Sequence, residues 1–332
     1  MDHEFRYLPS EALADLAGMS EYVDAVRAGY HRHGNASART EARTKLFHSQ
    51  QEGMLMYYGA LLPTIGVMGT FTYVGEFAGG DAWFLTFLAD ADTGDPFCVV
   101  DSPGINPYKT GATGGVGVDA LATEDAATVG VVGSGVQAKG QLLATATVRD
   151  LTDVRVYSPT AANRRAFAAT MDDRLDADVR AAGAAAGAVD GADIVITATR
   201  ATEPVVAWDD LSPGAHVTAM GQSHPERREL DSETVARSVY VPDHRERAEL
   251  ASGELLLARR DYGDVAIHAD LGEVVAGTVP GRTSESNVTV FDSGGTGIET
   301  VAATYMIYER AVAADYGIEL PITPGSAAVP EL

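Results

Sequence analysis

A short glycine-rich segment between a predicted strand and a predicted helix is the feature that most constrains the fold of this chain. The run Thr128 to Val132 is apolar and rich in valine, as in a buried parallel strand. Gly133 and Gly135 follow it, and residues 137–148 are rich in Ala, Leu and Gln, which favours a helix. Such glycines allow a tight turn and a close approach to a pyrophosphate, which the start of the helix receives. The segment predicts a dinucleotide site, although an ordinary glycine-rich turn would share this pattern.

The end of the next predicted strand indicates which dinucleotide fits. NAD sites usually place Asp or Glu about 20 residues after the glycines, where it holds the ribose 2′-hydroxyl. Here the strand at 154–157 is followed by hydroxyls and arginines, which suit a 2′-phosphate. NADP is therefore slightly favoured over NAD as the cofactor, unless Arg164 and Arg165 merely form a solvated helix face. The cofactor-binding residues predicted from these two segments are Gly133, Ser134, Gly135, Val136, Gln137, Ser158, Thr160 and Arg164.

Acidic residues dominate the composition: 47 Asp and Glu stand against 24 Lys and Arg, a formal net charge of -23. This excess is typical of proteins that stay soluble in high salt, where screening reduces self-repulsion. We expect a halophilic, cytoplasmic protein without a signal peptide; an unusually acidic mesophilic enzyme is the alternative. The sequence has no basic patch, so we do not expect nucleic-acid binding. Cys98, the single cysteine, excludes an intrachain disulfide, and no histidine-carboxylate spacing predicts a metal site.

The chain divides into two kinds of pattern. From residue 126 onward, strands and helices alternate, as in a parallel sheet covered by helices. The first 120 residues instead suggest a helix at 13–30 and short strands at 66–73, 83–88 and 96–100, followed by a helix over 106–122. The uncharged run 53–75 is long enough to span a bilayer, but glycines and a proline interrupt it. We interpret it as the end of a helix followed by core strands, so no membrane partner is expected.

Five segments in order resemble the ornithine cyclodeaminase and mu-crystallin family: 133–138, 191–199, 221–231, 271–277 and 288–299. The resemblance implies an α/β fold with a Rossmann-type parallel-sheet domain at 121–301. A discontinuous α+β domain for substrate binding and dimerisation would comprise 1–120 with 302–332. The resemblance also adds Ala198, Thr199 and Gly221 to the cofactor-binding residues and implies a homodimer. A small imino or amino acid is the implied substrate.

Departures from the family pattern narrow the chemistry. Ser223 replaces the aspartate of the cyclodeaminases, and Met68–Thr72 occupies the region of a usual lysine, which makes cyclodeamination doubtful. Lys109 and Thr110 replace an Arg-Thr pair whose arginine holds a substrate carboxylate. The predicted substrate-binding residues are Arg39, Lys109 and Thr110, with Arg43 as the alternative to Arg39, and the predicted catalytic residues are Lys109, Ser223, His224 and Glu299.

Three of these assignments have plainer alternatives. Lys109, one of only three lysines with Lys45 and Lys139, would otherwise be a surface residue beside a helix. His224 would donate a proton or simply lie in a surface loop. Glu299 would orient the site, or it would simply be a first-turn carboxylate that the helix dipole stabilises.

The preferred function is an NAD(P)-dependent oxidoreductase that reduces a cyclic ketimine such as a pyrroline- or piperideine-2-carboxylate. Ornithine cyclodeaminase, which would convert ornithine to proline and ammonia with recycled NAD, is the main alternative. Alanine dehydrogenase is another. A mu-crystallin-like protein that binds cofactor with little turnover remains the non-enzymatic alternative.

Overall fold

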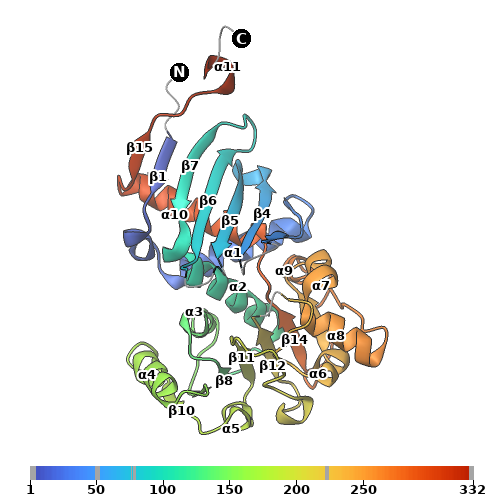
Figure 1. Ribbon diagram of the computed structural model, residues 1–332. Coiled ribbons are helices and arrows are strands. Elements are labelled where there is room, and N and C mark those ends of the chain that lie inside the picture. The colour runs from blue at the N-terminus through green and yellow to red at the C-terminus, as the bar shows by residue number, and fades with distance from the viewer. Residues whose placement is uncertain (1–4, 49–52, 76, 78–79, 221–223, 329–332) are drawn as a thin grey trace.

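Two sheets organise the protein, which is described here from a computed structural model over residues 5–48, 53–75, 77, 80–220 and 224–328. Figure 1 shows one sheet at each end of the molecule, with helix α2 (Asn106–Leu121) between them. The chain passes from the first sheet to the second through α2 and returns before helix α10 (Gly297–Ala313). The predicted α/β architecture is therefore confirmed.

The second sheet is entirely parallel, in the order β10-β9-β8-β11-β12-β14-β13. The chain reverses its direction of winding between β8 and β11, and the carboxyl ends of strands at such a switch point are where open α/β sheets bind ligands. The strands are β8 (Thr128–Val132), β9 (Asp153–Tyr157), β10 (Asp178–Ala181), β11 (Ile194–Thr197), β12 (His216–Ala219), β13 (Val239–Pro242) and β14 (Thr289–Asp292).

The first sheet is mixed and draws on both ends of the chain. Its order is β15-β1-β7-β6-β5-β4-β2, with β3 paired to β4, so the last strand lies beside the first. The strands are β1 (Phe5–Leu8), β2 (Arg39–Thr40), β3 (Thr44–Phe47), β4 (Met54–Leu62), β5 (Val67–Gly75), β6 (Trp83–Asp90), β7 (Pro96–Asp101) and β15 (Ile318–Leu320).

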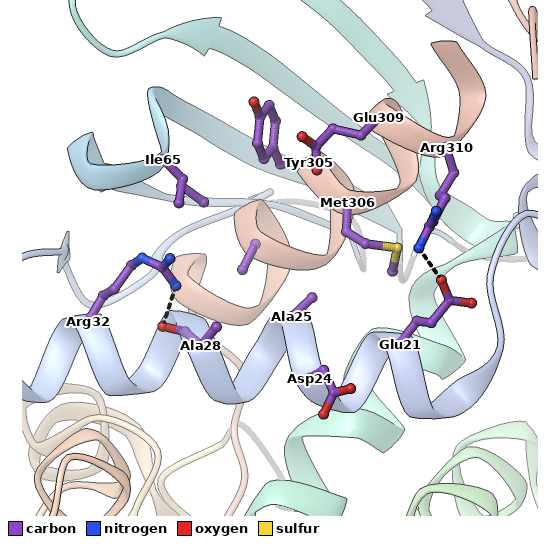
Figure 2. Close-up of a pocket in the computed structure, with 11 residues that line it drawn as sticks. Glu21, Asp24, Ala25, Ala28, Arg32, Ile65, Tyr305, Met306, Glu309 and Arg310 are labelled. Carbon is purple, nitrogen blue, oxygen red and sulfur yellow. Dashed lines mark hydrogen bonds and ion pairs between the residues drawn. The ribbon is translucent and has the colours of Figure 1, made fainter. Parts of the chain in front are cut away.

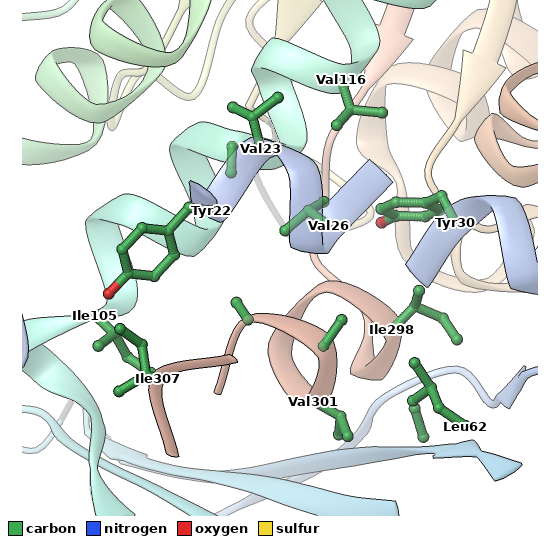
Figure 3. Close-up of a cluster of buried hydrophobic side chains, with 14 of the residues drawn as sticks. Tyr22, Val23, Val26, Tyr30, Leu62, Ile105, Val116, Ile298, Val301 and Ile307 are labelled. Carbon is green, nitrogen blue, oxygen red and sulfur yellow. The ribbon is translucent and has the colours of Figure 1, made fainter. Parts of the chain in front are cut away.

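Helix α1 (Met19–Gly34) and α10 cover one face of the first sheet, and α2 joins them in a shared core (Figure 3). Gly297 lies directly against the backbone of Gly59 in β4, so α10 packs on the first sheet from its first residue. The other α-helices are α3 (Val136–Thr145), α4 (Ala161–Asp172), α5 (Ala185–Val189), α6 (Ser232–Arg237), α7 (Arg245–Ala251), α8 (Gly253–Tyr262), α9 (Leu271–Val275) and α11 (Gly325–Ala328). Short 3-10 helices span Ser10–Asp15, Pro63–Ile65, Ser102–Gly104 and Trp208–Asp210.

The glycines of α2 have a packing role. A Cβ atom at Gly111 would lie 2.4 Å from the carbonyl oxygen of Gly140 in α3, and one at Gly140 would lie 2.3 Å from that of Pro107. The two helix backbones therefore touch, which side chains at these positions would prevent. This contact fixes the start of α2 against the helix that follows the glycine loop.

A surface pocket of about 460 Å³ lies between α1 and α10 (Figure 2). Glu21 and Arg310 form an ion pair of 2.5 Å at one end, and Arg32 lies at the other. None of the predicted site residues that the structure describes lines this pocket. It is therefore a groove between two helices, separate from the residues on which the sequence motifs converge.

Two expectations for the first half were wrong in detail. The run 53–62 is strand β4 and not the end of a helix, and residues 10–15 form a separate turn of 3-10 helix before α1. Among the helices that the described ranges contain, none has the length and apolar character needed to cross a bilayer.

Candidate functional site

The loop after β8 is shaped by its first glycine. Gly133 has a φ of 122°, which L side chains rarely adopt, and a Cβ atom there would lie 2.3 Å from the carbonyl oxygen of Ala198. Its N–H donates to the carbonyl of Tyr157 at 2.8 Å. Gly133 thus brings together the carboxyl ends of β8, β9 and β11, which places the predicted residues Ala198 and Thr199 beside the loop.

The second glycine of the loop, Gly135, is not required by a close contact with the described residues. Gly135 has extended backbone angles as the N-cap of α3, and a Cβ atom there would meet no atom of the described residues within 4 Å. The space in front of the helix is therefore open, as a pyrophosphate at a helix N-terminus requires. Beside it, Gln137 Oε1 is buried without a hydrogen-bond partner among the described residues, and Val136 is 60% exposed. These features fit a bound dinucleotide.

The end of β9 carries hydroxyls and a guanidinium. Ser134 Oγ donates to Ser158 Oγ at 2.9 Å, and Arg164 Nη1 donates to the carbonyl of Ser158 at 2.7 Å. The Arg164 guanidinium also lies over the Tyr157 ring, 5.5 Å from its centroid. Thr160 is exposed as the N-cap of α4. Arg164 is therefore held at the strand end and is not directed away along the helix.

A buried carboxylate that the sequence did not suggest supports the neighbouring loop. Glu229 accepts the N–H of Thr199 at 2.6 Å and the hydroxyl of Thr197 at 2.9 Å. Glu254 in turn accepts the N–H of Glu229 at 2.6 Å, and burial raises the pKa of Glu254 well above its usual value. Glu229 lies in the segment 221–231, but nothing local in the sequence links it to residues some 30 positions earlier.

Lys109 and Glu299 meet in the interior between α2 and α10. Lys109 is 3% exposed, and its Nζ lies 3.8 Å from Glu299 Oε1 and 5.2 Å from the centroid of the Phe71 ring. Glu299 also accepts the Tyr30 hydroxyl at 2.8 Å and the Thr296 hydroxyl at 2.6 Å. Lys109 is thus no surface residue, and Glu299 combines the two interpretations: it caps α10 and faces the ammonium.

The two candidate arginines occupy different places. Arg39 is exposed on β2, opposite Leu61. Arg43 is half-buried, lies 5.7 Å from the centroid of the Tyr58 ring, and donates through Nη2 to the carbonyls of Gly294 and Gly295, the latter at 2.7 Å. A Cβ atom on Gly295 would be 3.3 Å from Glu299 Oε1. Arg43, the alternative in the sequence, is therefore the arginine next to the Lys109–Glu299 pair.

The remaining predicted residues have varied surroundings. Thr110 is half-buried on α2, and its carbonyl accepts from Gln141 Nε2 at 2.9 Å. His224 is a turn residue whose Nδ1 accepts the N–H of Glu226 at 3.1 Å. Gly221 and Ser223 lie outside the described residues. The register of β3 places Lys45, which the sequence did not single out, opposite Met56, a neighbour of Arg43.

Comparison with known proteins places the chain in a family. Residues 9–315 match the model of the ornithine cyclodeaminase/mu-crystallin family. Mouse ketimine reductase mu-crystallin is 34% identical over 222 residues, which are 67% of this chain and 67% of that protein. The structure of Thermococcus litoralis Δ1-pyrroline-2-carboxylate reductase, in complex with NADH and L-proline, covers 95% of this chain and 100% of its own with a TM-score of 0.90 at 29% identity. An archaeal alanine dehydrogenase dimer with bound NAD covers 96% of this chain and 100% of its own, with a TM-score of 0.89 at 28% identity. The chain belongs to the ornithine cyclodeaminase/mu-crystallin family, as its five sequence segments predicted.

Proposed function

We propose that this protein is a nicotinamide-dependent oxidoreductase that reduces a cyclic ketimine carboxylate of the pyrroline or piperideine type. The observation that carries the proposal is the buried Lys109 with Arg43 beside it, at the joint between the dinucleotide loop and the first sheet. Helix α2 contacts α3 at Pro107 and Gly111, on either side of Lys109. The similarity to the mouse ketimine reductase and to the Thermococcus litoralis Δ1-pyrroline-2-carboxylate reductase supports the same class of substrate.

The roles of the chain's own residues follow from their charges. Lys109 from α2 and Arg43 from the segment between β2 and β3 supply two cations near Glu299, which suits a substrate carboxylate. Glu299 keeps the Lys109 site favourable for a cation, and its hydrogen bonds to Tyr30 and Thr296 fix it in place. Burial, and after it the Glu299 carboxylate, raises the pKa of Tyr30 well above its usual value, so Tyr30 remains a hydrogen-bond donor. The bound nicotinamide supplies the hydride.

Turnover of three substrates distinguishes this function from its alternatives. Consumption of NADPH with 1-pyrroline-2-carboxylate supports the reductase. Conversion of ornithine to proline and ammonia without net loss of cofactor would show a cyclodeaminase, and pyruvate with ammonia would serve an alanine dehydrogenase. Fluorescence titration that shows cofactor binding, with turnover of none of these substrates, would show a binding protein and refute the proposal.

We further propose that NADPH is preferred to NADH. The support is the position of Arg164 at the end of β9, beside the Ser158 and Thr160 hydroxyls, in a segment (158–165) without a carboxylate. Arginine binds a 2′-phosphate but gives nothing comparable to a 2′-hydroxyl. Arg164→Ala should therefore weaken NADPH binding on the order of 10-fold and leave NADH binding nearly unchanged. Equal losses for the two cofactors would contradict the preference.

A homodimer through the open face of the first sheet completes the proposal. The register aligns outward side chains across β3, β4, β5 and β6, and several are large, apolar and exposed: Leu46, Tyr57, Trp83, Leu85 and Phe87. Trp83 is 66% exposed, in a chain with a net charge of -23. An apolar patch of this kind on a highly charged protein favours burial against a second copy. Sedimentation should give a dimer, and Trp83→Glu with Phe87→Glu should give a monomer; a monomeric native protein would refute the interface.

A further inference from the structure

The turn that carries the two carbonyl partners of Arg43 is held from its other side. Gly294 and Gly295 link the end of β14 to the N-cap of α10. Gly295 has a φ of 91°, a conformation in which a side chain would be strained. Two successive glycines leave a peptide unit unusually free to rotate. Something other than the backbone itself must therefore fix the direction of these carbonyls.

A buried ion pair provides that restraint. Asp243 Oδ2 accepts the N–H of Gly295 at 2.5 Å, while Asp243 Oδ1 accepts from Arg247 Nε at 2.8 Å and Nη2 at 2.6 Å. Asp243 is fully buried and Arg247 is 3% exposed. A Cβ atom on Gly294 would lie 2.5 Å from Arg247 Cζ, so the guanidinium packs directly on the turn. Arg247 is anchored in turn by the carbonyl of Asp292 at 2.8 Å.

The geometry of one peptide bond connects the two sides. The N–H of Gly295 and the carbonyl of Gly294 belong to the same planar, trans peptide unit, so they point in opposite directions. Because Asp243 takes the N–H, the carbonyl of Gly294 faces Arg43. We propose that Asp243 is a positioning residue, which orients Arg43 for the substrate carboxylate through this peptide while Arg247 holds Asp243 in place. The inference rests on the proposed role of Arg43.

Asp243→Asn tests the positioning role of Asp243 with little change in the shape of the side chain. Both carboxylate oxygens of Asp243 are used, whereas an asparagine offers one acceptor and a donor that neither the N–H nor the guanidinium can use. With NADPH and 1-pyrroline-2-carboxylate, we expect KM for the imine to rise on the order of 10-fold. The value of kcat and the Kd for NADPH should change little, because the lost interaction concerns substrate binding alone. Arg247→Lys serves the same test if Asp243→Asn does not fold.

A double-mutant cycle separates positioning from general loosening. Arg43→Ala alone should raise KM, and Asp243→Asn added to it should raise KM no further. The matched control is Tyr240→Phe, which removes a hydrogen bond to Asp292 in the same buried network without touching the turn. Tyr240→Phe should lower the melting temperature and leave KM unchanged. If the KM increases of Arg43→Ala and Asp243→Asn are additive, or if Tyr240→Phe raises KM as much as Asp243→Asn does, the positioning role of Asp243 is wrong while the substrate clamp stands. An unchanged KM in Arg43→Ala would refute the substrate clamp as well.

Discussion

Replacement of Lys109 by alanine tests the centre of the proposed site. Lys109 is 3% exposed and its ammonium lies 3.8 Å from Glu299, so its loss removes a buried cation from the expected site of the substrate carboxylate. A charge-assisted contact contributes about 1.5–3 kcal/mol, which corresponds to a KM increase of about 10- to 100-fold. The fold should survive, because Glu299 keeps its hydrogen bonds to Tyr30 and Thr296. Breaking a buried ion pair costs about 3–5 kcal/mol at most, and those hydrogen bonds make a smaller loss of stability the expected result.

Initial rates with NADPH and 1-pyrroline-2-carboxylate measure the effect directly. Lys109→Arg should retain much of the activity, since it keeps the positive charge and offers a planar fork of donors to a carboxylate. Lys139→Ala in α3 removes the same charge from elsewhere and should leave KM for the imine unchanged. Cofactor Kd, from nicotinamide fluorescence, should be the same in all three variants. Wild-type KM in Lys109→Ala, or an equal increase in Lys139→Ala, would refute the carboxylate clamp.

Three further predictions concern the loop, the charge and a buried histidine. Gly135→Val should abolish NADPH binding with an unchanged melting temperature. Gly133→Ala should lower the melting temperature, because only this substitution adds a Cβ atom in a strained, occupied position. Circular dichroism measures the melting temperatures and fluorescence titration measures NADPH binding; the opposite pattern would contradict the prediction. The melting temperature should rise steeply from dilute to molar KCl, since screening weakens carboxylate repulsion in a chain of charge -23, and a flat profile would exclude salt adaptation. Burial lowers the pKa of His216 from 6.5 to about 3, so as the pH decreases the imidazole binds a proton in the unfolded chain before it does so in the folded protein. The free energy of unfolding should therefore fall as the pH decreases from 6.5 towards 3. Urea unfolding at several pH values should show a shallower fall in His216→Gln.

Local pattern predicted what depends on neighbours in sequence, and failed where distant segments decide. The glycine loop, the strand before it and the strand at 154–157 follow from the sequence, because a buried apolar strand and an Ala-rich helix are visible over a few residues. The short strand β10 (Asp178–Ala181) has no such pattern and was not predicted. Strand β4 was taken for the end of a helix, since its run from Met54 to Leu62 is apolar on both faces and shows no alternation. The choice between Arg39 and Arg43 depends on contacts with Gly294 and Gly295, which lie some 250 residues away.

The pairing of β1 with β15 has a consequence for how the polypeptide acquires its shape during synthesis. All strands of the parallel sheet come from one continuous stretch, β8 to β14, so the sheet is complete once β14 has left the ribosome. The first sheet emerges earlier, yet α10, which covers it, and β15, which pairs with its first strand, are translated last. Contacts between such remote segments are slow to form, because the loop between them must close first. The half made first is therefore completed only after β14, and its apolar strands lack the elements that cover and pair with them until α10 and β15 have emerged.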